Sequence, residues 1–137
     1  MTLEERINNC YDNRELLKDP AYQAAINEVV GMLDQGKIRV AEHHGDDWIV
    51  NDWIKKAVLM YFPIQKMETI ELGPFEFHDK IPLKKNFEAQ GVRVVPHAIA
   101  RHGAFLERGC IMMPSYVNIG AYAVSYTHLT LPTICSV

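Results

Sequence analysis

The spacing of apolar residues changes along the chain, and its first part has the period of α-helices. Three positions near the N-terminus fall on one helical face: Leu3, Ile7, and Cys10 or Tyr11. Asp19 followed by Pro20 is a typical helix start, and Gly36 is placed to end that second helix. Its apolar stripe consists of Ile26, Val29, Val30 and Leu33. Two packed helices are therefore expected before residue 37.

The next segment alternates between apolar and polar residues as a strand does. Residues 38–42 alternate, residues 43–47 are polar and include Gly45, and residues 48–50 are apolar again, which predicts a β-hairpin. Asn51 or Asp52 can cap a third helix that Pro63 ends, and its apolar positions are Trp53, Ile54, Ala57, Val58 and Tyr61. Short strands are expected at 67–72 and 75–77. Residues 1–90 are interpreted as one N-terminal helical and mixed domain.

From residue 91 the period becomes six. One bulky apolar residue recurs at that step in Ile99, Phe105, Ile111 and Val117, and one small residue in Gly103, Gly109, Ser115 and Ala121. This repeat fits neither a helix nor a simple strand, but it is typical of a left-handed parallel β-helix. Each hexad would form one side of a triangular coil with its apolar residue inward. The predicted fold class is α+β: a helical domain with a hairpin, then the first coil of a β-helix over 91–122.

The end of the chain departs from this pattern. A single coil leaves its apolar axis uncovered, so the native protein is expected to continue beyond it as a longer solenoid. Arg108 is the last charged residue, and Val124–Thr133 breaks the six-residue period. That decapeptide matches one translated frame of an adaptor widely used in transposon-based sequencing libraries. Residues 123–137 are therefore expected to be a non-native tail on a truncated chain, and they are excluded from the fold prediction.

Composition narrows the class of protein. The 137 residues carry a net charge of −3 without a cluster of Lys or Arg, which argues against nucleic acid or a membrane surface as partner. The N-terminus is charged and has no signal-peptide pattern, and no apolar run is long enough for a transmembrane helix. The three cysteines, Cys10, Cys110 and Cys135, are far apart and odd in number. They predict free thiols in the cytoplasm.

Three segments, in this order, carry a family resemblance: Lys37–Glu42 with Trp48 and 53–59, then Gly91–Pro96, then Met113–Tyr122. Together they resemble 2,3,4,5-tetrahydropyridine-2,6-dicarboxylate N-succinyltransferase, a hexapeptide-repeat acyltransferase of the diaminopimelate and lysine pathway. The resemblance implies a homotrimer that transfers succinyl from succinyl-CoA to the amino group of open-chain tetrahydrodipicolinate. Succinyl-CoA would be a co-substrate, with no bound cofactor. The chain would be an inactive N-terminal fragment.

The resemblance also assigns one site residue. Arg93 matches the family's substrate-binding arginine, and a guanidinium can hold a carboxylate through two parallel hydrogen bonds. Arg101 is interpreted as a solvated surface residue, with an acidic ligand as the alternative. Ser115, Tyr116 and Asn118 are interpreted as corner residues of the coil. The family's catalytic carboxylate and most of its CoA surface would lie beyond Tyr122.

Six histidines raise the question of a metal-dependent hydratase. His43 and His44 are predicted in the hairpin turn, His97 and His102 near the first coil, and His128 in the tail. Zinc needs three convergent ligands, which this spacing does not indicate, so no metal site is predicted. Two other functions remain open: another hexapeptide acyltransferase, acting on a sugar amine, and a non-catalytic assembly domain.

Overall fold

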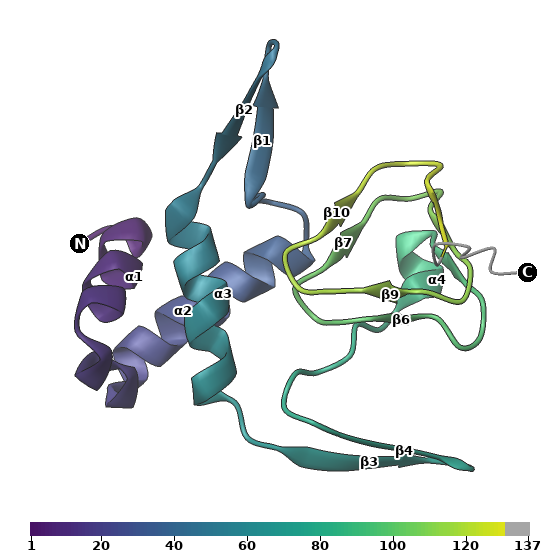
Figure 1. Ribbon diagram of the computed structural model, residues 1–137, viewed down its shortest axis with the longest axis horizontal. Helices are drawn as coiled ribbons and strands as arrows, with labels where there is room; N and C mark the ends of the chain where they lie inside the picture. Colours follow the sequence, from purple (N-terminus) through teal and green to yellow (C-terminus); the bar gives the residue numbers. More distant parts are fainter. Residues whose placement is uncertain (131–137) are drawn as a thin grey trace, which may run out of the picture.

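A computed structural model describes residues 1–130 of the chain, and its first part is a helical unit (Figure 1). It contains α1 (Leu3–Asp12), the 3₁₀ helix η1 (Arg14–Lys18), α2 (Pro20–Asp34) and α3 (Asp52–Ile64). Thr2 and Glu5 form a reciprocal capping box at α1. The Asp19 side chain accepts from the N–H of Ala21 at 2.9 Å, which confirms the predicted start of α2.

The apolar stripes of the three α-helices meet in one core. Both α1 and α2 pack against α3. The buried residues of this core are Ile7, Cys10, Ala25, Ile26, Val29, Val30, Leu33, Ile54, Ala57, Met60, Tyr61 and Ile81. The stripe predicted for α2 is fully confirmed. Helix α3 continues one residue past Pro63, because the proline lies in its last turn and ends the helix without breaking its body.

Two antiparallel hairpins project from this unit in different directions (Figure 1). The first pairs β1 (Ala41–His44) with β2 (Asp47–Val50), and the second pairs β3 (Glu68–Leu72) with β4 (Phe75–Asp79). Strands were expected in both segments, but the first begins at Ala41 instead of residue 38, and the prediction that His43 and His44 occupy the first turn is wrong. The turn is only Gly45 and Asp46, so both histidines lie on β1.

After the short helix α4 (Phe87–Gln90), the chain winds through seven two-residue strands. These are β5 (Arg93–Val94), β6 (Ile99–Ala100), β7 (Phe105–Leu106), β8 (Ile111–Met112), β9 (Tyr116–Val117), β10 (Tyr122–Ala123) and β11 (His128–Leu129). They stack in three parallel ladders, β5–β8–β11, β6–β9 and β7–β10. Arg93 pairs with Ile111, and Ile111 with His128, so each turn takes three strands. The parallel, six-residue character of the prediction is confirmed.

The predicted inward phase of the coil is wrong by one residue over most of its length. The buried side chains are Ala100, Leu106, Met112 and Val117, whereas Ile99, Phe105 and Ile111 are only half-buried. The corner between β8 and β9 is one residue shorter than the others, because a single bend at Pro114 replaces a two-residue turn. Stepping back from Val117 six residues at a time therefore gives Ile111, Phe105 and Ile99, which are the outward-facing neighbours of the buried residues.

Glycines show the same shift at the corners. Gly103, Gly109 and Gly120 all have positive φ, between 90° and 99°, a region that L-residues with a Cβ avoid. The prediction placed the third small residue at Ser115, within the shortened corner, and the fourth at Ala121, one residue past Gly120. Tyr126 occupies the next corner with φ 62°. This corner therefore places a bulky residue where three earlier corners have glycine.

The predicted break of the repeat after Tyr122 is absent from the backbone up to residue 130. Strands β10 and β11 stack on β7 and β8, and Ala123 and Leu129 pack against the buried residues of the coil. The rest of the expected tail, residues 131–137, lies outside the described residues. Within residues 1–130, no helix has the combination of length and apolar composition needed to cross a membrane.

The helical unit sits on the ladder of β7 and β10. Gly36 follows α2 with φ 72°, and a Cβ there would be 2.7 Å from the Phe105 ring. The guanidinium of Arg39 lies 3.4 Å from the centre of the Tyr122 ring, which itself contacts Phe105 at 4.8 Å. The outward-facing Phe105 is therefore covered by the end of α2, which explains an apolar residue on the outside of the coil.

Candidate functional site

Arg93 begins β5 and points away from the coil. Its backbone N–H donates to the Cys110 carbonyl at 3.0 Å, while the next residue, Val94, packs against the buried residues of the coil. The side chain is exposed, and within residues 1–130 it forms no ion pair. An exposed guanidinium without an acidic neighbour can receive a carboxylate from a ligand.

A second arginine lies close to the start of this strand. Gly91 has φ 70°, and a Cβ on it would be 2.5 Å from Nη1 of Arg108. Nη2 of Arg108 donates to the Ala89 carbonyl at 3.0 Å. The guanidinium of Arg108 is thus held over Gly91, two positions before Arg93. The position of Arg108 could not be predicted from the sequence, because a lone Arg at a corner has no distinctive pattern.

Arg101 is not the solvated surface residue that was predicted. Its side chain is 17% exposed, Nη2 lies 3.1 Å from Oδ2 of Asp79, and Nη1 donates to Oδ1 of Asn118 at 3.2 Å. The rings of Phe62 and Tyr116 lie within 6 Å of its guanidinium carbon, at 5.6 and 5.7 Å. Arg101 therefore joins the coil to β4 and α3. The alternative prediction was that Arg101 binds an acidic ligand, but the carboxylate of Asp79 already pairs with it.

Two residues of the Met113–Tyr122 segment have the predicted corner role. Ser115 Oγ donates to the Met113 carbonyl at 2.6 Å, and Asn118 Oδ1 accepts from the N–H of Ile119 at 2.8 Å. Tyr116 instead lies on β9 and is exposed. Local hydrogen bonds of this kind stabilise tight turns, so Ser115 and Asn118 shape the coil.

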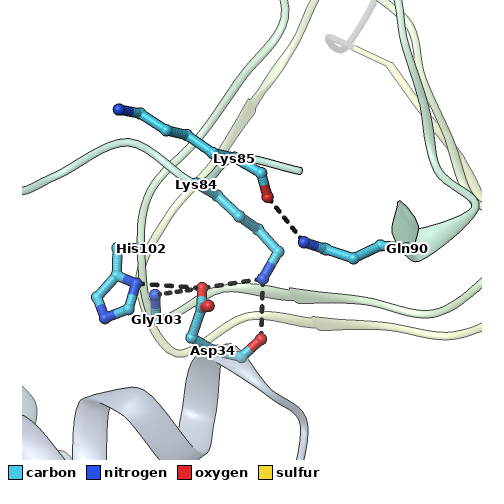
Figure 2. A network of polar contacts seen from close by, with 6 residues as sticks. All are labelled: Asp34, Lys84, Lys85, Gln90, His102 and Gly103. Atoms are coloured by element: carbon cyan, nitrogen blue, oxygen red, sulfur yellow. Dashed lines mark hydrogen bonds and ion pairs between the residues drawn. The ribbon is translucent and has the colours of Figure 1, made fainter. Parts of the chain in front are cut away.

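The most buried charge of the described chain lies where the helical unit meets the coil (Figure 2). The side chain of Lys84 is 2% exposed, and its Nζ donates to the backbone carbonyl of Asp34 at 2.8 Å and to its Oδ1 at 2.9 Å. The same Oδ1 accepts from the N–H of Gly103 at 3.0 Å, and Nδ1 of His102 lies 3.5 Å away. Asp34 thus connects the end of α2 to a coil corner.

This network was not foreseen from the sequence. Asp34 ends a helix and Lys84 follows a proline-containing loop, positions at which charged residues are ordinarily solvated. Lys84 is buried where the end of α2 approaches the corner at Gly103. A Cβ on Gly103 would lie 2.6 Å from Ile119 and 3.1 Å from Val30, so the approach also depends on this glycine.

The two cysteines within the described residues lie in the two hydrophobic cores. Cys10 and Cys110 are buried and free, and burial raises the pKa of both thiols above the ordinary value. Cys110 Sγ donates to the Val124 carbonyl at 3.0 Å. Cys135 lies outside the described residues. Over residues 1–130, no three His, Cys, Asp or Glu side chains are grouped as metal ligands.

Comparison with known proteins matches both parts of the chain. Residues 2–64 match the family described as tetrahydrodipicolinate N-succinyltransferase N-terminal. A 2,3,4,5-tetrahydropyridine-2,6-dicarboxylate N-succinyltransferase of Legionella pneumophila (strain Paris) is 45% identical over 129 residues, which covers 87% of this chain and 47% of that protein. The protein of the same name from Paraburkholderia phymatum is 43% identical over 131 residues, covering 88% and 48%. That from Sodalis glossinidius is 40% identical over 131 residues, with the same coverage.

These matches confirm the resemblance that the sequence motifs predicted. The chain spans about half the length of the curated relatives it matches. The match exceeds the 2–64 domain, so it includes residues of the coil as well as the helical unit.

Proposed function

We propose that this chain is the front part of a tetrahydrodipicolinate N-succinyltransferase. The starting point is the match of residues 2–64 to the N-terminal domain family of that enzyme. The complete enzyme would transfer succinyl from succinyl-CoA to the amino group of open-chain tetrahydrodipicolinate, on the route to diaminopimelate and lysine. The observation that carries the proposal is the 45% identity to a relative of that name, over a match that includes the coil.

Arg93 is proposed to bind one carboxylate of the substrate. The substrate has two carboxylates, and a bidentate arginine contact would fix one of them so that the amine is oriented toward the thioester. Arg93 is exposed at the start of β5, with no acidic partner among residues 1–130. Its position on a strand suits it to orienting a substrate, because pairing with β8 holds its backbone in the ladder.

The remaining groups of the reaction would come from outside the described residues. Attack by an amine on a thioester needs a proton acceptor and donors to the tetrahedral oxyanion. By the family resemblance, the catalytic carboxylate and most of the CoA surface follow Tyr122 in the complete protein. The 137-residue chain alone is therefore expected to have no turnover.

The proposed enzyme would also have the domain limits and assembly expected from the sequence. The domain limits would be 1–90 and 91–122, the coil a left-handed β-helix, and the complete enzyme a cytoplasmic homotrimer without nucleic-acid or membrane partners. The parallel three-ladder stacking supports the β-helix. The free, buried thiols of Cys10 and Cys110 fit a reducing compartment.

Residues 123–137 are proposed to be a non-native tail. Tyr126 supports this, because it takes φ 62° at the corner where three preceding corners have glycine. A non-glycine residue in this region costs about 1–3 kcal/mol, which a coil-forming sequence avoids. The nucleotide sequence around codon 123 tests the proposal: an authentic reading frame without adaptor bases would refute it.

The enzymatic proposal can be tested in a hybrid protein. Residues 1–122 would be joined to the corresponding second half of the Legionella pneumophila relative, and succinyl-CoA-dependent acylation measured in the parent hybrid and in its Arg93→Ala and Arg93→Lys variants. We expect Arg93→Ala to raise KM for the dicarboxylate about 10- to 100-fold, the range for a lost charge-assisted hydrogen bond. Arg93→Lys should recover part of the loss.

The outcomes also separate the alternatives. An unchanged KM in Arg93→Ala would remove this residue from the site. Acylation of a sugar amine in preference to the dicarboxylate would favour the other hexapeptide acyltransferases. A folded hybrid that transfers no acyl group to either would favour an assembly domain.

A further inference from the structure

The corner that carries Arg108 stacks on the start of the strand that carries Arg93. Strand β8 pairs with β5 so that Ile111 lies opposite Arg93, and the N–H of Gly109 donates to the Gly91 carbonyl at 2.9 Å. Arg108 comes just before Gly109, so it belongs to the part of the second coil that covers the entry to β5. Two arginines that are distant in the sequence are therefore brought to the same edge of the coil.

The side chain of Arg108 turns back toward this strand. A Cβ on Gly91 would lie 2.5 Å from Nη1 of Arg108 and 2.9 Å from its Cζ, so the guanidinium fills the space that a side chain at Gly91 would need. Nη2 donates to the Ala89 carbonyl at 3.0 Å, which holds the group in place. Gly91 precedes Arg93 by two residues, and two residues of extended chain span at most about 7 Å. A small ligand bound to Arg93 can therefore also reach Arg108.

Both guanidinium groups keep donors for such a ligand. A guanidinium has five N–H donors in a planar fork, and the single side-chain hydrogen bond that Arg108 makes within residues 1–130 occupies one nitrogen. Arg93 makes no side-chain hydrogen bond to that part of the chain. Both side chains are exposed to solvent. Each can therefore receive a carboxylate through charge-assisted hydrogen bonds.

The acidic residues near this edge do not neutralise the two arginines. Glu88 on α4 and Glu107, just before Arg108, are the carboxylates closest to them in the sequence. Over residues 1–130, neither forms an ion pair with Arg93 or Arg108. Glu107 Oε2 accepts from Ser125 Oγ at 2.8 Å, on the side of the following coil, whereas Arg108 turns back toward the start of β5. In the described chain the two positive charges thus lack an acidic partner.

We infer that Arg93 and Arg108 form a two-point site for a dicarboxylate, with one carboxylate on each guanidinium. The inference deepens the proposed function and rests on it for the class of ligand, because that function requires a substrate with two carboxylates. Arg93 alone would leave the far end of the ligand free to turn. A second contact at Arg108 fixes both ends, which orients the amine and distinguishes a dicarboxylate from a monocarboxylate. Because the Ala89 carbonyl already holds Arg108, little side-chain freedom is lost on binding.

The test compares two probes of equal chain length, pimelate with two carboxylates and heptanoate with one. Both arginines lie within the described residues, so the 137-residue chain itself is titrated, and the backbone amide NMR signals of Gly91 and Gly109 report binding. Arg93→Gln and Arg108→Gln each remove one guanidinium. Arg6→Gln is the matched control, since Arg6 is exposed on α1 and has no ion-pair partner among residues 1–130. The ratio of the two Kd values is taken within each protein, so a modest loss of stability does not change it.

Failure of this site and failure of the proposed enzyme are separate results, because the titration contains no succinyl-CoA. Preferential pimelate binding that is lost in Arg108→Gln would establish the site even if the hybrid protein transferred no succinyl group. Succinyl transfer by the hybrid, together with an unchanged ratio in Arg108→Gln, would leave the enzyme proposal intact and overturn the site.

The parent chain and Arg6→Gln should bind pimelate at least about tenfold more tightly than heptanoate, which corresponds to about 1.4 kcal/mol for the second carboxylate. In Arg93→Gln and in Arg108→Gln the ratio should fall to about 2, because either end of pimelate can then occupy the one remaining arginine. Arg108→Lys should keep part of the preference, since it retains the charge without the planar fork. A parent chain without saturable pimelate binding, or an Arg108→Gln protein with the parent's ratio, would overturn the inference.

Discussion

Lys84 Nζ and Asp34 Oδ1 lie 2.9 Å apart and connect two parts of the chain separated by 50 residues. The lysine comes from the loop before α4, and the aspartate is the last residue of α2. Because Gly103 donates to the same carboxylate oxygen, the contact also reaches the coil. The helical unit and the coil therefore share a buried polar joint in addition to apolar packing.

Removing Asp34 should destabilise the chain more than removing Lys84. Asp34→Ala leaves the nearly fully buried ammonium of Lys84 without its counter-ion and should cost about 3–5 kcal/mol of unfolding free energy. Lys84→Met should cost less, since Asp34 is 20% exposed and keeps the Gly103 N–H. Urea denaturation measures both. The double variant should lose less unfolding free energy than the sum of the losses of the two single variants. Simple additivity would contradict energetic coupling between Asp34 and Lys84.

The inward phase of the coil gives a second prediction. Met112 is fully buried and Ile111 is half-buried, although they are adjacent on β8. Met112→Ala should lose about 2–5 kcal/mol, whereas Ile111→Ala should lose clearly less, because only the first opens a cavity in the axis of the coil. The difference between their urea midpoints is the measurement. Equal losses, or a larger loss for Ile111→Ala, would restore the phase predicted from the sequence.

Tyr126 allows a test of corner strain. Tyr126→Gly should be more stable than Tyr126→Ala by about 1 kcal/mol, since glycine accepts φ 62° and alanine keeps the Cβ that disfavours it. Both variants lose the ring that lies beside Gly109, so comparing them isolates the backbone effect. Thermal unfolding of the two proteins gives the result. An alanine variant as stable as the glycine variant would show that this corner is unstrained.

Alkaline pH should destabilise the chain through its buried thiols. Burial raises the pKa of Cys10 and Cys110 in the folded protein, so the folded state favours the neutral thiol. Their contribution is complete below the unfolded thiol pKa of about 8.5 and is lost as the pH rises through the raised folded value. The urea midpoint should fall between pH 8 and about pH 10.

The Cys10→Ala/Cys110→Ala protein is the control for this pH dependence. It should show a smaller fall, with the remainder due in part to Tyr61, whose pKa burial also raises. A pH dependence identical to that of the parent would exclude the thiols as its source.

Local signals predicted the helical unit well. The Asp19–Pro20 start, the α2 stripe and Gly36 each depend on neighbours within a few residues, and all three are confirmed. The coil was predicted as a repeat but misphased, because both Ile99–Phe105–Ile111 and Ala100–Leu106–Met112 recur every six residues. Only the short corner at Pro114 distinguishes them, and its length depends on backbone geometry that the apolar pattern does not encode.

The predicted roles of charged residues depended on distant contacts. Arg101 was predicted to be solvated, yet Asp79 reaches it from β4, 22 residues earlier in the chain. Lys84 has no local mark of burial, and its partner lies at the end of α2. Arg93, by contrast, was assigned from a motif, and its exposure on β5 is compatible with ligand binding.

Whether this chain is the front part of an N-succinyltransferase is decided by the hybrid of residues 1–122 with the second half of the Legionella pneumophila relative. The quantity to measure is its rate of succinyl-CoA-dependent thiol release with tetrahydrodipicolinate as acceptor. We expect a kcat within about tenfold of that of the intact relative, which corresponds to a difference in barrier of about 1.4 kcal/mol. A correctly folded hybrid that releases no thiol above the rate without acceptor would contradict it.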